Sequence, residues 1–129
     1  MGYLLAIDLG TTFTAAAVSR NGRVEMVSLG LHTSAIPSLV FMRDDEEMLV
    51  GEPAARRGAT DPARLAREFK RRMGDTAPIM LGTTPYSAER LTAELLRHVI
   101  GADSQQEGGP PDRVAITYPS TLNGPQFAG

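Results

Sequence analysis

The chain has 129 residues, 42% hydrophobic and 22% charged, which is the composition of one soluble globular domain with its own core. Its net charge of −2 provides no basic field for nucleic acid, and no apolar run is long enough to span a bilayer. Because there is no cysteine, disulfides and thiolate metal sites are excluded, and we expect a cytoplasmic protein.

The first predicted elements are three strands in an antiparallel meander. Apolar runs predict strands at residues 3–8, 13–19 and 23–28. Asn21-Gly22 joins the last two strands and is a strong signal for a type I′ hairpin turn. The first two strands are joined by a turn that contains Gly10, Thr11 and Thr12.

This first turn carries groups that suit a phosphate. Glycine lets backbone N–H groups approach an anion closely, and Thr11 and Thr12 add hydroxyl donors. The carboxylate of Asp8 would repel a bare phosphate, so its presence predicts a cation, most simply Mg²⁺ held through water. The alternative is an ordinary hairpin with polar turn residues.

Two further strands are predicted after a polar loop at residues 29–35. Pro37 opens a strand at 38–42, a charged turn follows at 43–47, and residues 48–50 pair back on 38–42. The acidic residues of this turn are expected to be solvated.

Helices are predicted over the next stretch, beginning with a short one at 52–58. Asp61-Pro62 is a helix start, and Leu65, Phe69 and Met73 share one face of the helix that is expected to run to Met73. Residues 75–85 are predicted to be a loop with a short strand at 79–81.

The clearest helix begins after Ser87 and is expected to end at Gly101. Residues 102–112 are predicted to be a surface linker. Residues 113–118 have no polar alternation, which predicts a buried central strand of a parallel sheet.

Six segments, taken in order, resemble one known family. They resemble the N-terminal part of the nucleotide-binding domain of the seventy-kilodalton heat-shock chaperones, in the actin-like ATPase superfamily. The segments are Ile7–Thr12, Ile36–Val40, Leu49–Ala54, Phe69–Gly74, Tyr86–Glu89 and Val114–Pro119.

The resemblance implies an α/β fold of the actin-like ATPase (ribonuclease H-like) type, with a mixed sheet, an antiparallel meander and helices. It implies a partial first lobe, with a core at 1–37 and 86–129 and a smaller outer subdomain at about 38–85. ATP would lie between this lobe and a second one. We therefore expect a truncated piece that lacks its second lobe and C-terminal domain, although a short natural gene stays open.

The resemblance also implies roles for the first turn. Asp8 would organise the Mg²⁺ shell through water, and Gly10, Thr11, Thr12 and Phe13 would bind the ATP or ADP phosphates.

Two later residues receive roles in the same way. Lys70 would reach the γ-phosphate and the attacking water, and positive charge there suits phosphoryl transfer. The alternative is that Lys70, Arg71 and Arg72 form a solvated basic face. Pro119 would relay the nucleotide state to a partner domain, and its alternative role is that of a strand terminator.

Three departures from the family pattern identify a divergent member. Phe13 occupies a position where a small polar residue is usual, the stretch between Gly74 and Ser87 is short, and Phe127 falls where an arginine belongs. That arginine helps to pass the signal to the substrate-binding domain, so the departure puts chaperone coupling in doubt.

Three functions remain open at this point. The first is an ATPase module in which nucleotide state is coupled to lobe closure and a partner domain, the fragment alone being inactive. The second is a nucleotide-dependent interaction module without hydrolysis, and the third, ranked last, is a sugar kinase. Client peptides or co-chaperones are the expected partners, and an isolated fragment is prone to artificial dimerisation.

Overall fold

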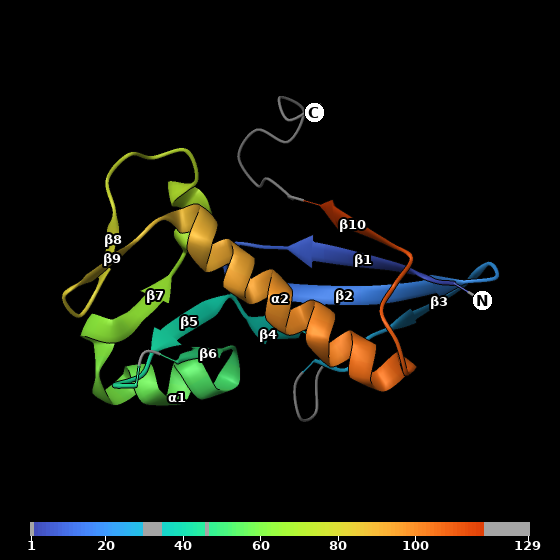
Figure 1. Cartoon of the computed structure of the whole chain (residues 1–129), viewed down its shortest axis with the longest axis horizontal. Helices are drawn as coiled ribbons and strands as arrows, with labels where there is room; N and C mark the ends of the chain where they lie inside the picture. Colours follow the sequence, from blue (N-terminus) through green and yellow to red (C-terminus); the bar gives the residue numbers. More distant parts are fainter. Residues whose placement is uncertain (1, 30–34, 46, 118–129) are drawn as a thin grey trace.

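The computed structural model describes residues 2–29, 35–45 and 47–117, which form a mixed α/β fold (Figure 1). A five-stranded sheet contains β1 (Leu4–Leu9), β2 (Phe13–Arg20), β3 (Arg23–Met26), β4 (Ala35–Pro37) and β10 (Arg113–Thr117). A second sheet contains β5 (Leu39–Met42), β6 (Met48–Val50) and β7 (Leu65–Arg67), and β8 (Ile79–Leu81) pairs with β9 (Thr84–Tyr86). The helices are α1 (Glu52–Thr60) and α2 (Ala88–Glu107), with 3₁₀ turns η1 (Pro62–Arg64) and η2 (Phe69–Arg72).

The predicted meander is confirmed. β1 and β2 pair antiparallel from Leu4↔Ser19 to Leu9↔Thr14, and β2 pairs antiparallel with β3. Asn21 and Gly22 have φ values of 54° and 80°, the positive values that a type I′ turn requires. The side chains of β1 alternate, so that the odd-numbered positions face the core.

The last described strand, β10, pairs parallel with β1 from Leu4↔Arg113 to Asp8↔Thr117. The predicted strand is confirmed, but its predicted burial is wrong. Most of β10 is exposed to solvent, and Val114 is 39% exposed. Among the described residues β10 pairs only with β1 and forms the edge of the sheet. Tyr118 lies outside the described residues.

The chain passes from the first sheet to the second at Ser38. The prediction that Pro37 opens a strand at 38–42 is wrong in detail, because Pro37 ends β4 and the next strand begins at Leu39. Ser38 lies between the two strands and donates its N–H to the carbonyl of Thr12 (2.8 Å). The predicted pairing of 48–50 back on this strand is confirmed, from Val40↔Val50 to Met42↔Met48.

The predicted helix over 61–73 is wrong. Residues 65–67 form β7, which pairs antiparallel with β5, and short 3₁₀ turns stand on either side. Glu68 has a φ of 53°, a left-handed conformation that interrupts any continuous helix. Phe69 is buried as expected, whereas Met73 is 38% exposed.

Helix α2 begins as predicted, since the Ser87 hydroxyl accepts a hydrogen bond from the Arg90 N–H (3.0 Å). Its predicted end at Gly101 is wrong, because the helix continues to Glu107 and ends at Gly108 with φ 82°. Asp103 lies in the segment predicted to be a surface linker, but its side chain is fully buried.

The predicted strand at 79–81 is confirmed as β8, and its partner β9 was missed. None of the helices in the described part of the chain has the length and apolarity that a membrane crossing requires.

One apolar core joins the sheets and α2. Figure 1 shows α2 as a long diagonal helix, and its contacts include β5 and β6 of the second sheet. Leu91, Leu95 and Val99, at helical spacing, are fully buried in the same cluster as Leu5 and Ile7 of β1. The helix therefore fixes the meander against the second sheet, which positions the groups described next.

Candidate functional site

The candidate site lies where the parallel strands β1 and β10 end. Parallel strands present their carboxyl ends at one edge of a sheet, which is where ligands of open α/β sheets bind. Asp8 and Thr117 are register partners at this edge, and the Thr117 hydroxyl donates to Asp8 Oδ1 (3.3 Å). Asp8 is exposed, so its carboxylate is accessible to a ligand.

The turn from Gly10 to Phe13 follows directly. The Gly10 N–H donates to the Phe13 carbonyl (3.0 Å), which closes the turn. A Cβ at position 10 would lie 2.4 Å from the same carbonyl oxygen, so only glycine fits without a backbone shift. Thr11 is partly exposed and Thr12 is exposed at the tip.

Two buried hydroxyls lie behind this turn. The Ser38 hydroxyl donates to the Gly10 carbonyl (2.9 Å) and lies 2.8 Å from the Thr14 hydroxyl. Thr14 is fully buried and Ser38 is 3% exposed. Sequence reasoning gave neither residue a role. The available signals were a threonine at an inward-facing position of β2 and a serine directly after Pro37.

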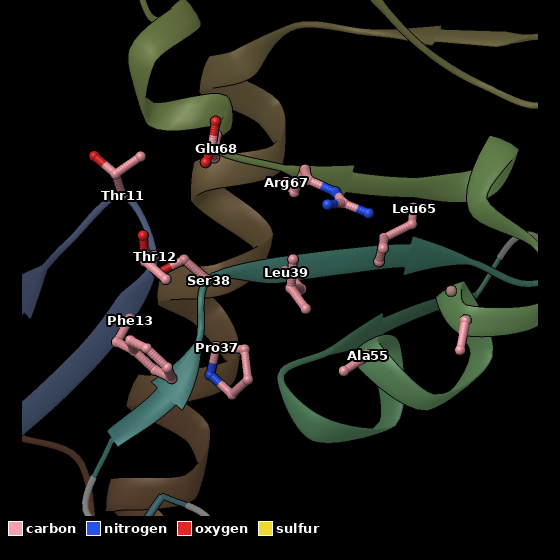
Figure 2. A pocket seen from close by; sticks show the side chains of 12 residues that line it. Thr11, Thr12, Phe13, Pro37, Ser38, Leu39, Ala55, Leu65, Arg67 and Glu68 are labelled. Carbon is pink, nitrogen blue, oxygen red and sulfur yellow. The ribbon is translucent and has the colours of Figure 1, made fainter.

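A cleft of about 340 Å³ opens beside the turn (Figure 2). Its walls come from the turn, from the crossing between the sheets, from α1 and from β7. Phe13, which is 59% exposed, contributes an apolar side chain to it. The lining residues are Thr11, Thr12, Phe13, Pro37, Ser38, Leu39, Ala55, Gly58, Ala59, Leu65, Arg67 and Glu68.

Lys70 lies in η2 and is partly buried. Burial lowers the pKa of its ammonium group, and the negative charge of Asp8 opposes that effect. The two residues, far apart in sequence, therefore interact electrostatically. The helix predicted over 61–73 is absent, so Lys70 lies in a 3₁₀ turn and not on a helix face opposite Phe69 and Met73.

The donor set at Asp8 fits a cation held mainly through water. Mg²⁺ keeps several of its waters and is usually bound by one or two carboxylates together with substrate phosphates. Among the described residues there is no cluster of three or more His, Asp or Glu side chains that could form a protein cage for a metal. Pro119 and Phe127 lie outside the described residues, so the structure places neither of them.

Several known proteins that resemble this chain come from one family. Residues 4–80 match the family model described as Hsp70 protein. The chain is 34% identical over 127 residues to the chaperone protein DnaK of Elusimicrobium minutum, which covers 95% of this chain and 20% of that protein. It is 31% identical over 130 residues to the DnaK of Endomicrobium trichonymphae (98% of this chain, 21% of the relative). It is 30% identical over 125 residues to that of Thermotoga maritima (96% and 21%). The chain thus spans about a fifth of the length of these curated relatives.

Proposed function

Because the chain belongs to the Hsp70 chaperone family, we propose that it forms the phosphate-binding side of an ATP-binding and ATP-hydrolysing module. The observation that carries the proposal is the convergence of three features at one place. The glycine-dependent turn and the exposed carboxylate of Asp8 are contiguous in sequence, and the cation of Lys70 comes from a distant segment. Together they supply the anion-binding backbone, the metal partner and the positive charge that binding of a nucleoside triphosphate requires.

Each residue has a distinct task in this proposal. The Gly10–Thr12 backbone and the two threonine hydroxyls hold the β- and γ-phosphates, and Phe13 lines the adjoining cleft. Asp8 would hold Mg²⁺ through water, and Thr117 orients its carboxylate. Mg²⁺, when bound, neutralises charge on the phosphates.

Lys70 acts as a fixed positive charge that binds the γ-phosphate and orients the attacking water. Phosphoryl transfer depends on positioning and electrostatic stabilisation more than on covalent chemistry, so one preorganised cation has a large effect. The Asp8 charge supports the protonated form of Lys70, which keeps the positive charge available despite partial burial.

We also propose how the chain is divided and how it fits into the full-length protein. Residues 1–37 and 86–129 form the core of a first lobe, and about 38–85 form its outer subdomain. A second lobe completes the ATP site, and Pro119 relays lobe closure to a C-terminal domain that meets client peptides or co-chaperones in the cytoplasm.

The second candidate is a nucleotide-dependent interaction module that does not hydrolyse ATP. The observation that favours it is Phe13, whose large exposed side chain lines the cleft next to Thr12. An apolar group there excludes water from part of the cleft, and hydrolysis requires a water at the γ-phosphate.

Single-turnover ATP hydrolysis by the full-length protein, with and without Mg²⁺, tests the proposal. Mg²⁺-dependent release of phosphate supports the ATPase. Tight binding of ATP without release of phosphate supports the second candidate. Absence of nucleotide binding contradicts both.

A further inference from the structure

The hydroxyl groups of Thr14 and Ser38 form a directional chain that ends on the turn. A carbonyl oxygen carries no hydrogen, so in the contact with Gly10 (2.9 Å) the Ser38 hydroxyl is the donor. Its single hydrogen is then used, and the 2.8 Å contact with Thr14 requires Thr14 to donate to Ser38. The order of donation is therefore Thr14 to Ser38 to Gly10.

The backbone of Ser38 adds a second anchor. Its N–H donates to the Thr12 carbonyl (2.8 Å), so Ser38 holds the carbonyl groups of both Gly10 and Thr12. There are no cis peptide bonds among the described residues, and in a trans peptide the C=O and the N–H of one unit point in opposite directions. Because the Gly10 carbonyl faces Ser38, the Thr11 N–H of the same peptide unit points away from Ser38.

Burial makes this arrangement rigid. Thr14 is fully buried and Ser38 is 3% exposed, so water does not replace either hydroxyl bond. The peptide between Gly10 and Thr11 would otherwise be free to flip, since glycine tolerates a wide range of backbone angles. The two hydroxyls thus restrain the Gly10–Thr11 peptide, which the glycine alone would leave flexible.

We propose that Ser38, supported by Thr14, is a positioning residue that fixes the Gly10–Thr11 peptide so that its N–H is directed at a nucleotide phosphate. This inference rests on the proposed function, because it assigns the turn a phosphate ligand. Ser38 acts through the backbone and does not touch the nucleotide.

The test measures binding of ADP, ATP and adenosine to the full-length protein by calorimetry. Ser38→Ala removes the donor to Gly10, and we expect affinity for ADP and ATP to fall about tenfold, the effect of one hydrogen bond of roughly 1.4 kcal/mol. Affinity for adenosine, which has no phosphate, is expected to stay unchanged. Thr92→Val is the matched control, because Thr92 is also a buried threonine whose hydroxyl donates to a side chain outside the turn, Met73 Sδ (3.2 Å).

A second pair of variants keeps the inference testable if Ser38→Ala does not fold. Thr14→Val removes the donor to Ser38 at nearly constant volume, and Thr14→Ser retains it. We expect Thr14→Val to weaken ADP relative to adenosine and Thr14→Ser to restore the wild-type ratio. An unchanged ratio of ADP to adenosine affinity in both Ser38→Ala and Thr14→Val, or in Thr14→Val alone where Ser38→Ala does not fold, overturns the positioning role. Absence of ADP binding by the wild-type protein overturns the proposed function instead.

Discussion

Lys70 and Asp8 form the electrostatic centre of the proposed site at the scale of single residues. Partial burial lowers the pKa of Lys70, and the carboxylate of Asp8 opposes that effect. Removal of the Asp8 charge is therefore expected to lower the pKa of Lys70 further.

Lys70→Ala is expected to lower the single-turnover rate of ATP hydrolysis by about two to three orders of magnitude, the usual effect of one preorganised electrostatic donor. Nucleotide affinity should fall much less, because the turn still holds the phosphates. Arg71→Ala is the matched control, since Arg71 is the exposed neighbour in the same 3₁₀ turn. Equal rates in the Lys70 variant and the wild type would remove Lys70 from the mechanism.

Asp8→Asn retains an oxygen that can accept from Thr117 but removes the negative charge. We expect the Mg²⁺ concentration required for tight nucleotide binding to rise about 10- to 100-fold, as for other residues that act on a metal through its outer shell. A Mg²⁺ titration of ADP affinity measures this shift. An unchanged midpoint would show that Asp8 does not support the cation.

At the scale of elements, a buried polar contact joins α2 to the first strand. The Tyr3 hydroxyl lies 2.6 Å from Asp103 Oδ2 and 2.8 Å from the Gly109 carbonyl. The Tyr3 hydroxyl is the donor in both contacts, so its single hydrogen is shared between the Asp103 carboxyl and the Gly109 carbonyl. Burial raises the pKa of the Asp103 carboxyl, and the hydrogen bond from Tyr3 partly opposes that effect.

Neighbouring charges complete this environment. Arg20 forms an ion pair with Glu107 (2.9 Å) and its guanidinium stacks over the Tyr3 ring. Glu107 raises the pKa of Asp103 and Arg20 lowers it, while burial remains the largest effect. Burial, together with Asp103, also raises the pKa of Tyr3 to about 12.

The Asp103→Asn variant is expected to lose the pH dependence of stability that the titration of the Asp103 carboxyl causes. In the wild type the raised folded pKa means that stability is greatest below the ordinary aspartate pKa of about 3.9 and falls as pH rises toward the folded value. The asparagine variant should therefore gain stability relative to wild type as pH rises from about 4 to 8. Thermal unfolding of both proteins across this pH range measures the difference. A constant difference would show that folding does not raise the pKa of Asp103.

Local signals in the sequence predicted the elements whose geometry depends on neighbouring residues. Asn21-Gly22 specifies its own turn, and Ser87 caps its own helix. The segment at 61–73 could not be read in this way, because Leu65 and Phe69 at four-residue spacing fit a helix equally well. Pairing with β5, a long-range contact, decides that residues 65–67 form a strand.

The same distinction applies to the candidate site. The turn residues and Asp8 are contiguous in sequence and could be identified together. Ser38 reaches the turn only because the chain crosses between the two sheets at this residue. Asp103 lies in a polar stretch of the sequence, and its burial depends on a contact with Tyr3, which is distant in sequence. Both depend on tertiary contacts that no local pattern encodes.

At the scale of the whole molecule, the described residues contribute the phosphate side of the proposed site. The 129-residue chain alone is expected to bind ADP more weakly than the full-length protein and to show no multiple turnover, because the second lobe would supply the adenosine contacts. Calorimetry and a steady-state phosphate assay on both proteins measure this, with size-exclusion chromatography as a control for association through exposed Val24 and Met26. Repeated turnover by the 129-residue chain would contradict the proposal.

The pairing of β1 with β10 has a consequence for biosynthesis. β1 ends at Leu9 and its partner begins at Arg113, so a ribosome adds roughly 100 residues before the pair can form. At about 5–20 residues per second this interval lasts roughly 5–20 s, during which one edge of β1 in the nascent chain has no partner from β10. The meander and α2 are available earlier, whereas the contact between Thr117 and Asp8 forms only after translation has passed residue 117. The edge that carries Asp8 and Thr117 is therefore assembled last, when the rest of this sheet has already been synthesised.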